Sequence, residues 1–287
     1  MDVKKTMKLN ELKELTQAKL LKIYGIEESR SIFHLLLNEF LGIDVINFHI
    51  NGDKKISLDS LNLFNEKISL IEKEIPVQYV IGHVMIEGLK IFVNKSVLIP
   101  RPDTELIIEK VLKNFKKNDN KNVLDIGTGT GCIILSILLE RKKFRGTGID
   151  TSKRAINIAK INAKMQQFGN RIRFINTDID NFFSNKYDLI VSNPPYIKKF
   201  KLRSLIEDVK NFEPKMALDG GPDGFSVVLK VIAKSSRLLK KNGMLILEID
   251  NTQVIKTKEM LKNYKFYTKD VFKDLSDKNR CITAIKL

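Results

Sequence analysis

The sequence has 287 residues, which is enough for one large domain or two ordinary ones. A hydrophobic content of 43% is typical of a globular protein with a core, and the best apolar run, residues 133–139, falls short of the ~18 residues of a membrane span. The formal net charge of +16 fits a nucleic-acid surface or an acidic or RNA-associated partner, and equally a composition in which lysines are spread along the chain.

The cysteines and histidines indicate which compartment, disulfide bonds and metal sites are to be expected. Cys132 and Cys281 lie inside apolar stretches and predict a reduced, cytoplasmic protein without disulfide bonds. The beginning of the chain shows no apolar block of a secretory signal peptide. His34, His49 and His83 are scattered, so we expect structural or surface roles for them and no metal site.

The first part of the chain predicts helices, because apolar residues recur at helical spacing from residue 8 to about residue 75. The first helix is expected to end at Gly25. Ser29 is expected to cap a second helix over residues 31–41 that closes at Gly42. A third helix is predicted over residues 58–74.

Residues 1–75 are therefore predicted to form a small all-α bundle that recognises the substrate, with a purely stabilising appendage as the alternative. Residues 76–100 change in character. The β-branched stretch 77–81 and two later apolar segments predict a hairpin-like connector between domains.

Residues 101–287 alternate strand and helix patterns, which predicts an α/β domain with a doubly wound parallel sheet. The two last strands need no helix between them and should pair antiparallel. Seven strands that end in such a hairpin resemble the class I S-adenosylmethionine-dependent methyltransferase fold. The predicted strands are 122–127, 145–150, 172–177, 188–193, 243–249, 266–272 and 280–287.

A glycine-rich loop follows the first of these strands and opens a long helix. Glycines at positions 127, 129 and 131 let the backbone approach a ligand closely. A dinucleotide-binding domain has a similar loop and is the obvious alternative. The loop residues expected to bind the cofactor are Gly127, Thr128, Gly129, Thr130 and Gly131.

Acidic residues at strand ends favour S-adenosylmethionine over a dinucleotide. Asp125 precedes the glycines and suits a ligand with an ammonium group. Asp150 can accept from two ribose hydroxyls, as it also would in a dinucleotide site. Asp178 is placed to accept from an adenine amino group, with Ile179 as an apolar wall. All of these lie at carboxyl ends of predicted parallel strands, where doubly wound sheets bind ligands.

The fourth strand runs into Asn193-Pro194-Pro195-Tyr196, which is suited to presenting a conjugated NH2 group to an electrophile. The Asn193 side-chain oxygen and the Pro194 carbonyl can accept from the two N–H groups. The prolines stiffen the loop, and the Tyr196 ring can stack on a planar group. The alternative is a turn that only ends the strand.

With these features assembled, the chain resembles the glutamine methyltransferases of class I peptide-chain release factors, the PrmC/HemK family. The resemblance covers nearly the full length. It is carried by residues 76–82, 98–105, 125–131, 192–196, 212–214, 217–224, 273–276 and Arg280. The Arg-Pro-Asp-Thr-Glu run at 101–105 and the Phe-Glu-Pro block at 212–214 are the most selective of these marks.

The resemblance implies the substrate, which is the glutamine of the release factor's Gly-Gly-Gln motif, methylated on its side-chain amide nitrogen. It also implies that the glycine-rich loop, Asp150 and Asn193 bind S-adenosylmethionine, and that residues 193–196 grip the amide. We expect direct in-line transfer, with the nitrogen held about 3–3.5 Å from the methyl group and no strong base. Catalytic roles are expected for Asn193, Pro194 and Tyr196.

Two departures from the family pattern stand out. Ile179 replaces an aromatic residue that some relatives carry beside the adenine, so stacking there is weaker. Asp250 follows Glu248-Ile249 where a glycine is common, and we attach no function to this change.

Three alternatives remain at this point. An N6-adenine DNA methyltransferase shares the conjugated NH2 chemistry and suits the basic charge, but the chain lacks an obvious target-recognition domain. A ribosomal-protein glutamine methyltransferase shares the site, and a non-enzymatic protein that binds the cofactor or RNA would not need the intact 193–196 motif.

We expect class I release factors as partners, no membrane, no required nucleic-acid contact and a monomer.

Overall fold

The computed structural model describes residues 6–287, which form two compact units. The helical unit comprises residues up to Gly82 together with residues 207–212. The sheet unit comprises residues 83–206 and 213–287. This division splits the expected connector, because residues 76–82 belong to the helical unit and residues 83–100 to the sheet unit. The expected division into domains at residues 75 and 100 stays a prediction.

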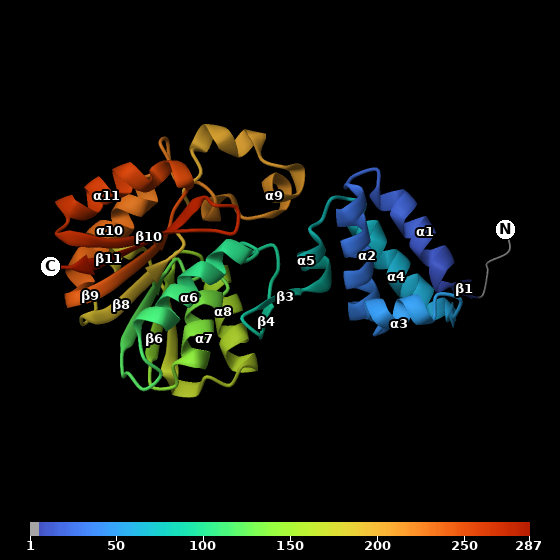
Figure 1. The fold of residues 1–287 in the computed structure, drawn as a ribbon, viewed down its shortest axis with the longest axis horizontal. Helices are drawn as coiled ribbons and strands as arrows, with labels where there is room; N and C mark the ends of the chain where they lie inside the picture. Colours follow the sequence, from blue (N-terminus) through green and yellow to red (C-terminus); the bar gives the residue numbers. More distant parts are fainter. Residues whose placement is uncertain (1–5) are drawn as a thin grey trace. The chain divides into compact units, whose positions relative to one another are not determined.

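The helical unit is built mainly of helices (Figure 1), and aromatic side chains meet in its core. Phe33 packs edge-to-face on Phe48 and Phe64, with ring centroids 5.5 and 5.9 Å apart. A two-residue strand pair, β1 with β2, joins the start of the unit to the loop before its fourth helix. The elements are β1 (Met7–Lys8), α1 (Leu9–Leu20), α2 (Ile26–Leu41), α3 (Val45–Ile50), β2 (Lys55–Ile56), α4 (Leu58–Ile71), α5 (Val77–Ile81) and α9 (Glu207–Phe212).

The third predicted helix, 58–74, begins as predicted but ends earlier, as α4 (Leu58–Ile71). For the first two predicted helices, two boundaries are wrong and one is confirmed. Helix α1 ends at Leu20, and Gly25 instead precedes α2 in an extended conformation with φ −69°. Ser29 lies in the first turn of α2, where its N–H donates to the Gly25 carbonyl at 2.9 Å. The acidic residues Glu27 and Glu28 favour this earlier start, because carboxylates stabilise a helix N-terminus. Gly42 does end α2, in the left-handed conformation with φ 65°.

The connector also differs from the prediction in its first part. Residues Val77–Ile81 form helix α5, whereas their β-branched side chains predicted extended chain. Pro76 begins this helix and Gly82, with φ 87°, ends it, so the flanking residues overrule the strand preference. A hairpin does follow, formed by β3 (His83–Ile86) and β4 (Leu89–Phe92). Its turn uses Glu87 and Gly88, both with positive φ, as two-residue hairpin turns require. Of the segments predicted to be extended, only the one that begins at Leu89 is a strand, and residues 97–99 are not in one.

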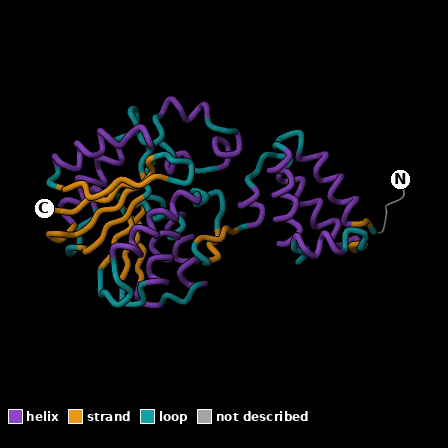
Figure 2. Tube along the Cα trace, in the orientation of Figure 1, coloured by secondary structure: helices purple, strands orange, loops and turns teal. Residues whose placement is uncertain are grey.

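The sheet unit contains the predicted seven-stranded sheet, whose strands are drawn in orange in Figure 2. The strand order is β10-β11-β9-β8-β5-β6-β7. The pairs β9–β8, β8–β5, β5–β6 and β6–β7 are parallel. Strand β11 pairs antiparallel with both β9 and β10, which confirms the terminal hairpin. The strands are β5 (Asn122–Ile126), β6 (Arg145–Asp150), β7 (Ile172–Asn176), β8 (Tyr187–Ser192), β9 (Leu239–Glu248), β10 (Phe266–Lys273) and β11 (Asn279–Lys286).

Helices cover both faces of this sheet. Leu124, Ile190 and Leu245 share one core cluster with Val228 of α10 and Leu261 of α11. Alternate strand residues point to the opposite face; there α7 packs closely enough that a Cβ on Gly146 would meet Ile134 at 2.8 Å. The helices are α6 (Glu105–Asn114), α7 (Cys132–Glu140), α8 (Lys153–Met165), α10 (Ser226–Leu238) and α11 (Val254–Asn263). The 3-10 turns are η1 (Pro102–Thr104), η2 (Gly169–Arg171), η3 (Ile179–Asn181), η4 (Lys199–Ser204), η5 (Lys215–Ala217) and η6 (Asn251–Gln253).

Cys132 and Cys281 are free and buried, as expected of core residues. Within residues 6–287, no helix is both long and apolar enough to cross a membrane. Over the same described range, no three His, Cys, Asp or Glu side chains gather into a group that could hold a metal ion. The histidines are less scattered in space than in sequence, since the rings of His34 and His49 lie 6.3 Å apart.

Candidate active site

A cavity of about 730 Å³ opens at the carboxyl ends of the parallel strands, where a doubly wound sheet is expected to bind ligands. Loops that follow β5, β6, β7 and β8 all contribute to its wall. Of the predicted cofactor residues, the cavity is lined by Gly127, Thr128, Gly129, Thr130, Asp150, Asp178, Ile179 and Asn193. The remaining one, Gly131, begins helix α7 with φ 81° and packs against the core.

The glycine-rich loop forms an open cradle in this cavity. Gly127 and Gly129 have φ values of 72° and 55°, a conformation that side chains rarely adopt. An added Cβ at Gly127 would meet nothing within 4 Å, so the backbone itself faces open space. The N–H groups of Gly127 and Thr128 donate to the Ile149 carbonyl at 2.9 and 3.0 Å, which ties the loop to β6.

Asp125 supports the loop from beneath and is not among the residues that line the cavity. It is fully buried, and its Oδ2 accepts from the Thr128 hydroxyl at 2.7 Å. Its Oδ1 is buried without a hydrogen-bond partner in the described residues. Burial raises the pKa of Asp125 to about 7, against the opposing effect of the Thr128 hydrogen bond.

Asp150 and Asp178 present acceptors on the cavity wall. Asp150 accepts from the Gly129 N–H at 3.0 Å and from the Ser152 N–H at 2.8 Å, which fixes its carboxylate. Burial raises the pKa of Asp150, and these two backbone hydrogen bonds oppose the rise. Asp178 caps η3 through the Asp180 N–H at 2.8 Å, and Ile179 lies beside it, 8% exposed.

The predicted motif at residues 193–196 follows β8 directly. Asn193 and Pro195 line the cavity, whereas Pro194 is buried and Tyr196 is partly buried, and neither is a lining residue. The Asn193 side-chain nitrogen donates to the Thr104 hydroxyl at 3.1 Å. The Tyr196 hydroxyl donates to Oε1 of Glu248 at 3.2 Å. Burial, followed by the nearby Glu248 carboxylate, raises the pKa of Tyr196.

Thr104 and Glu248 lie behind the motif, and the sequence did not predict their roles there. Glu248 ends β9, is 2% exposed and accepts from the Thr104 hydroxyl at 3.1 Å. Its pKa is raised to about 7 by burial, which outweighs the hydrogen bonds from Thr104 and Tyr196. Its place at the carboxyl end of a parallel strand was a usable signal, since the same rule identified Asp150 and Asn193.

The two most selective sequence marks meet in space. The side chain of Arg101 forms an ion pair with Glu213, whose side chain is 1% exposed. Oε2 of Glu213 also accepts from the Ile99 N–H at 3.2 Å. The Arg-Pro-Asp-Thr-Glu run is thus bound to the Phe-Glu-Pro block. The 3-10 turn η1 within this run carries Thr104, whose hydroxyl accepts from the Asn193 side chain.

Another sequence mark, residues 217–224, packs on the backbone of the motif. A Cβ on Gly220 would lie 2.7 Å from the Tyr196 Cα and 2.9 Å from the Pro195 oxygen. The Gly220 N–H donates to the Ile197 carbonyl at 2.9 Å, and the Ile197 N–H donates to the Leu218 carbonyl at 3.2 Å. Only glycine allows this close approach. Residues 217–224 therefore pack directly against the backbone of the 193–196 motif and support it.

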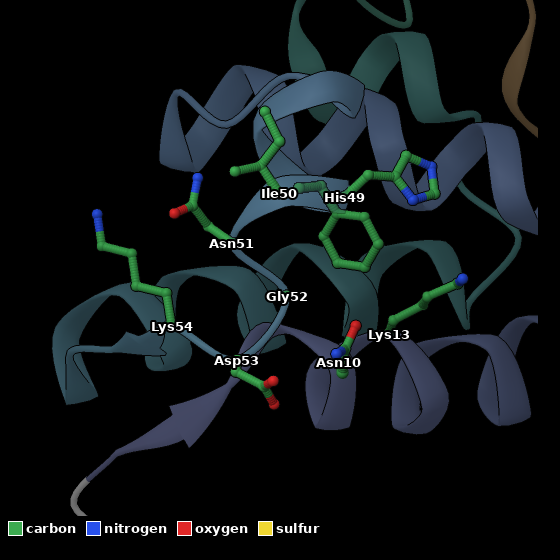
Figure 3. Close-up of a pocket in the computed structure, with 9 residues that line it drawn as sticks. Asn10, Lys13, His49, Ile50, Asn51, Gly52, Asp53 and Lys54 are labelled. Carbon is green, nitrogen blue, oxygen red and sulfur yellow. The ribbon is translucent and has the colours of Figure 1, made fainter.

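A second cavity lies within the helical unit and is lined by residues of α1, α3 and the loop after α3 (Figure 3). Its volume is about 470 Å³. Figure 3 shows Lys13, His49 and Asn10 around it, and Asp53 at its edge is paired with Lys8 at 3.0 Å. None of the predicted site residues lies in this cavity.

The comparisons with known proteins agree with the geometry of the sheet unit. Residues 104–211 match the family model of the methyltransferase small domain, and residues 15–82 match that of the PrmC N-terminal domain. Among solved structures, a methyltransferase from Pyrococcus furiosus shares the fold, with a TM-score of 0.53 and 19% identity over 69% of this chain and 89% of that chain.

Full-length relatives are more specific. A release factor glutamine methyltransferase from Clostridium acetobutylicum is 33% identical over 276 residues, which cover 93% of this chain and 97% of that protein. One from Thermodesulfovibrio yellowstonii is 36% identical over 267 residues, covering 92% and 93%. The predicted resemblance is confirmed, and the chain belongs to the release factor glutamine methyltransferase family.

Proposed function

We propose that this protein transfers a methyl group from S-adenosylmethionine to the side-chain amide nitrogen, N5, of the glutamine in the Gly-Gly-Gln motif of class I peptide chain release factors. The observation that carries the proposal is the placement of Asn193. Its amide stands on the wall of the cavity beside the glycine-rich cradle and is hydrogen-bonded from behind by Thr104. The family membership points to the same activity.

The residues that line the cavity suit S-adenosylmethionine. The open cradle at Gly127 and Gly129 admits a ligand against the backbone, and Asp150 and Asp178 offer carboxylates to hydroxyl and amino groups. Ile179 supplies an apolar wall for the adenine, weaker than an aromatic ring. When bound, this cofactor supplies an electrophilic methyl group on a sulfonium centre.

The substrate amide needs acceptors because its nitrogen lone pair is conjugated and therefore poorly nucleophilic. In the proposal the Asn193 oxygen and the Pro194 carbonyl accept from the two N–H groups, while Pro195 and the Tyr196 ring confine the planar group. These fixed dipoles favour the positive charge that develops on nitrogen. The methylated nitrogen is acidic and loses one proton to solvent, so no residue is assigned as a strong base.

A side-by-side transfer assay tests the substrate class. The protein is incubated with methyl-labelled S-adenosylmethionine and, separately, with a release factor, ribosomal proteins and DNA. We expect label in the release factor alone. Label in DNA or in a ribosomal protein, with none in the release factor, would refute the proposal. The monomeric state, the cytoplasmic location, the lack of a metal and of a required nucleic-acid contact stay predictions.

A further inference from the structure

A chain of hydrogen bonds runs from the active-site cavity into the core of the sheet unit. It begins at the Asn193 side-chain nitrogen, passes through the Thr104 hydroxyl at 3.1 Å, and ends on Oε2 of Glu248 at a further 3.1 Å. The second oxygen of Glu248 accepts from the Tyr196 hydroxyl at 3.2 Å. One buried carboxylate therefore holds both ends of the 193–196 motif.

The donor and acceptor groups of these side chains determine which of them donates in each hydrogen bond. At a pH above its pKa of about 7, Glu248 is ionised and only accepts hydrogen bonds, so the single hydroxyl hydrogen of Thr104 is then committed to it. The Thr104 oxygen is then left as an acceptor, and of the two ends of the Asn193 amide only the NH2 group can satisfy it. Thr104 and Glu248 are 3% and 2% exposed, so water has little access to replace either partner.

This direction matters because the oxygen and the nitrogen of an asparagine amide are nearly equal in size. Packing alone distinguishes them poorly, and hydrogen-bond partners decide the orientation. A reversed Asn193 would turn its own N–H groups toward the N–H groups of the substrate. The site would then repel the amide that it has to hold.

We propose that Glu248, acting through Thr104, is a positioning residue that fixes the Asn193 amide with its oxygen toward the substrate, and that it also anchors Tyr196. This inference rests on the proposed function and adds the residues that set the polarity of the site. Arg280 of β11 supports the arrangement, since it forms ion pairs with Asp103 at 3.1 Å and Asp274 at 2.9 Å. Asp103 precedes Thr104, so this pairing helps to fix the turn that carries the hydroxyl.

The test compares two matched variants of the full-length protein. Thr104→Ser keeps the hydroxyl, and Thr104→Val keeps the shape but removes it. We expect Thr104→Ser to stay within about 3-fold of the wild-type kcat, and Thr104→Val to lose roughly 10- to 100-fold in kcat, as expected for losing one hydrogen bond that orients a polar group. The Kd for S-adenosylmethionine, measured by calorimetry, should change by less than about 3-fold in both variants, since neither removes a predicted cofactor contact.

Glu248→Gln gives a second, independent variant, because it keeps the shape of the side chain but can donate to Thr104 and so loses the fixed direction. Above about pH 8, where Glu248 of the wild type is ionised, this variant should have a lower kcat while cofactor binding is retained. If Thr104→Val turns over as fast as Thr104→Ser, or Glu248→Gln as fast as the wild type, the inference is wrong although the proposed function stands. If the wild type does not methylate a release factor, the proposed function itself fails.

Discussion

Asn193 is the residue on which the proposed chemistry depends most directly. It lines the cavity, and its nitrogen is occupied by Thr104, so its oxygen is the group available to the substrate. Asn193→Ala should lower kcat by at least about 10²- to 10³-fold, the range seen when one preorganised group is removed from a transition-state site. Steady-state methylation of a release factor measures this effect.

The control for this prediction is Asn185→Ala, a change of the same kind at an exposed position. It should leave kcat unchanged. Asn185→Ala should bind S-adenosylmethionine with the wild-type Kd, and Asn193→Ala should largely keep this binding, because the glycine-rich loop and Asp150 remain in place. Near-normal turnover of Asn193→Ala would contradict the mechanism.

The raised pKa of Glu248 predicts how the stability of the protein depends on pH. Its pKa rises from 4.5 in a model peptide to about 7 in the folded protein, because burial and Asp103 outweigh Thr104, Tyr196 and Arg280. Of its other ionisable neighbours, Cys132 and Cys281 have pKa values raised by burial and stay neutral in this range. Between pH 4.5 and about 7, Glu248 is protonated in the folded state but ionised in the unfolded state. Its contribution to the free energy of unfolding therefore falls as the pH rises through this range.

The difference in unfolding free energy between wild type and Glu248→Gln isolates this effect. Denaturant titrations from about pH 4.5 to 7.5 should show the wild type losing roughly 2–3 kcal/mol relative to the variant. Asp125, whose pKa is also raised to about 7, is present in both proteins and cancels in the difference. A difference that stays flat over this range would show that Glu248 titrates normally.

The sequence predicted the cavity residues at strand ends better than the residues that hydrogen-bond to Asn193 and Tyr196 from behind. Asp150, Asp178 and Asn193 were found because parallel strands bring their carboxyl ends to one edge. Thr104 lies 89 residues from Asn193 and 144 residues from Glu248 along the chain. No local pattern encodes such a contact, so the hydrogen-bond chain emerged only from the tertiary structure.

At the scale of elements, the close packing of residues 217–224 on the motif gives a further prediction. A Cβ on Gly220 would meet the Tyr196 backbone at 2.7 Å, and backbone cannot move aside as a side-chain tip can. Gly220→Ala should therefore lower the unfolding free energy by about 1–3 kcal/mol and displace the motif enough to reduce turnover. Thermal unfolding and kcat are the measurements.

Gly25→Ala is the matched control for this substitution. Gly25 has an ordinary φ of −69°, and an added Cβ would meet nothing within 4 Å. We expect at most a small loss of stability and no loss of turnover. If the two variants behave alike, the close approach at Gly220 does not support the motif.

The strands were predicted well and the helix ends less well. Each of the seven strands overlaps its predicted range, although β9 begins at Leu239 rather than at residue 243. Buried parallel strands read as short apolar runs with clear limits. Helix ends depend on which turn residue is used: Gly25 begins α2 instead of ending α1, and Pro76 with Gly82 makes a helix of a β-branched stretch.

At the scale of the whole molecule, each unit has a core of its own. One core is built around Phe33 and Phe64, the other around the strands β5, β8 and β9. This division predicts that a chain beginning at residue 83 folds and binds S-adenosylmethionine. We expect it to methylate a release factor at least about 10-fold less efficiently in kcat/KM, a loss of roughly 1.4 kcal/mol or more of recognition by the helical unit.

Circular dichroism and calorimetry with S-adenosylmethionine control for the folding of this shortened chain. Undiminished kcat/KM in a folded, cofactor-binding fragment would assign the helical unit a stabilising role instead. The net charge of +16 does not decide between these roles, because the lysines are spread along the whole sequence.

The proposed reaction changes one nitrogen atom of one glutamine, and peptide mass spectrometry can locate that change directly. A purified release factor is incubated with this protein and S-adenosylmethionine, digested and mapped by fragmentation. We expect a gain of one methyl group, about 14 Da, on the side-chain amide of the Gly-Gly-Gln glutamine, and no gain with Asn193→Ala at matched cofactor binding. A methyl group on another residue, or none on the release factor while the protein is folded and binds the cofactor, would contradict the proposed reaction.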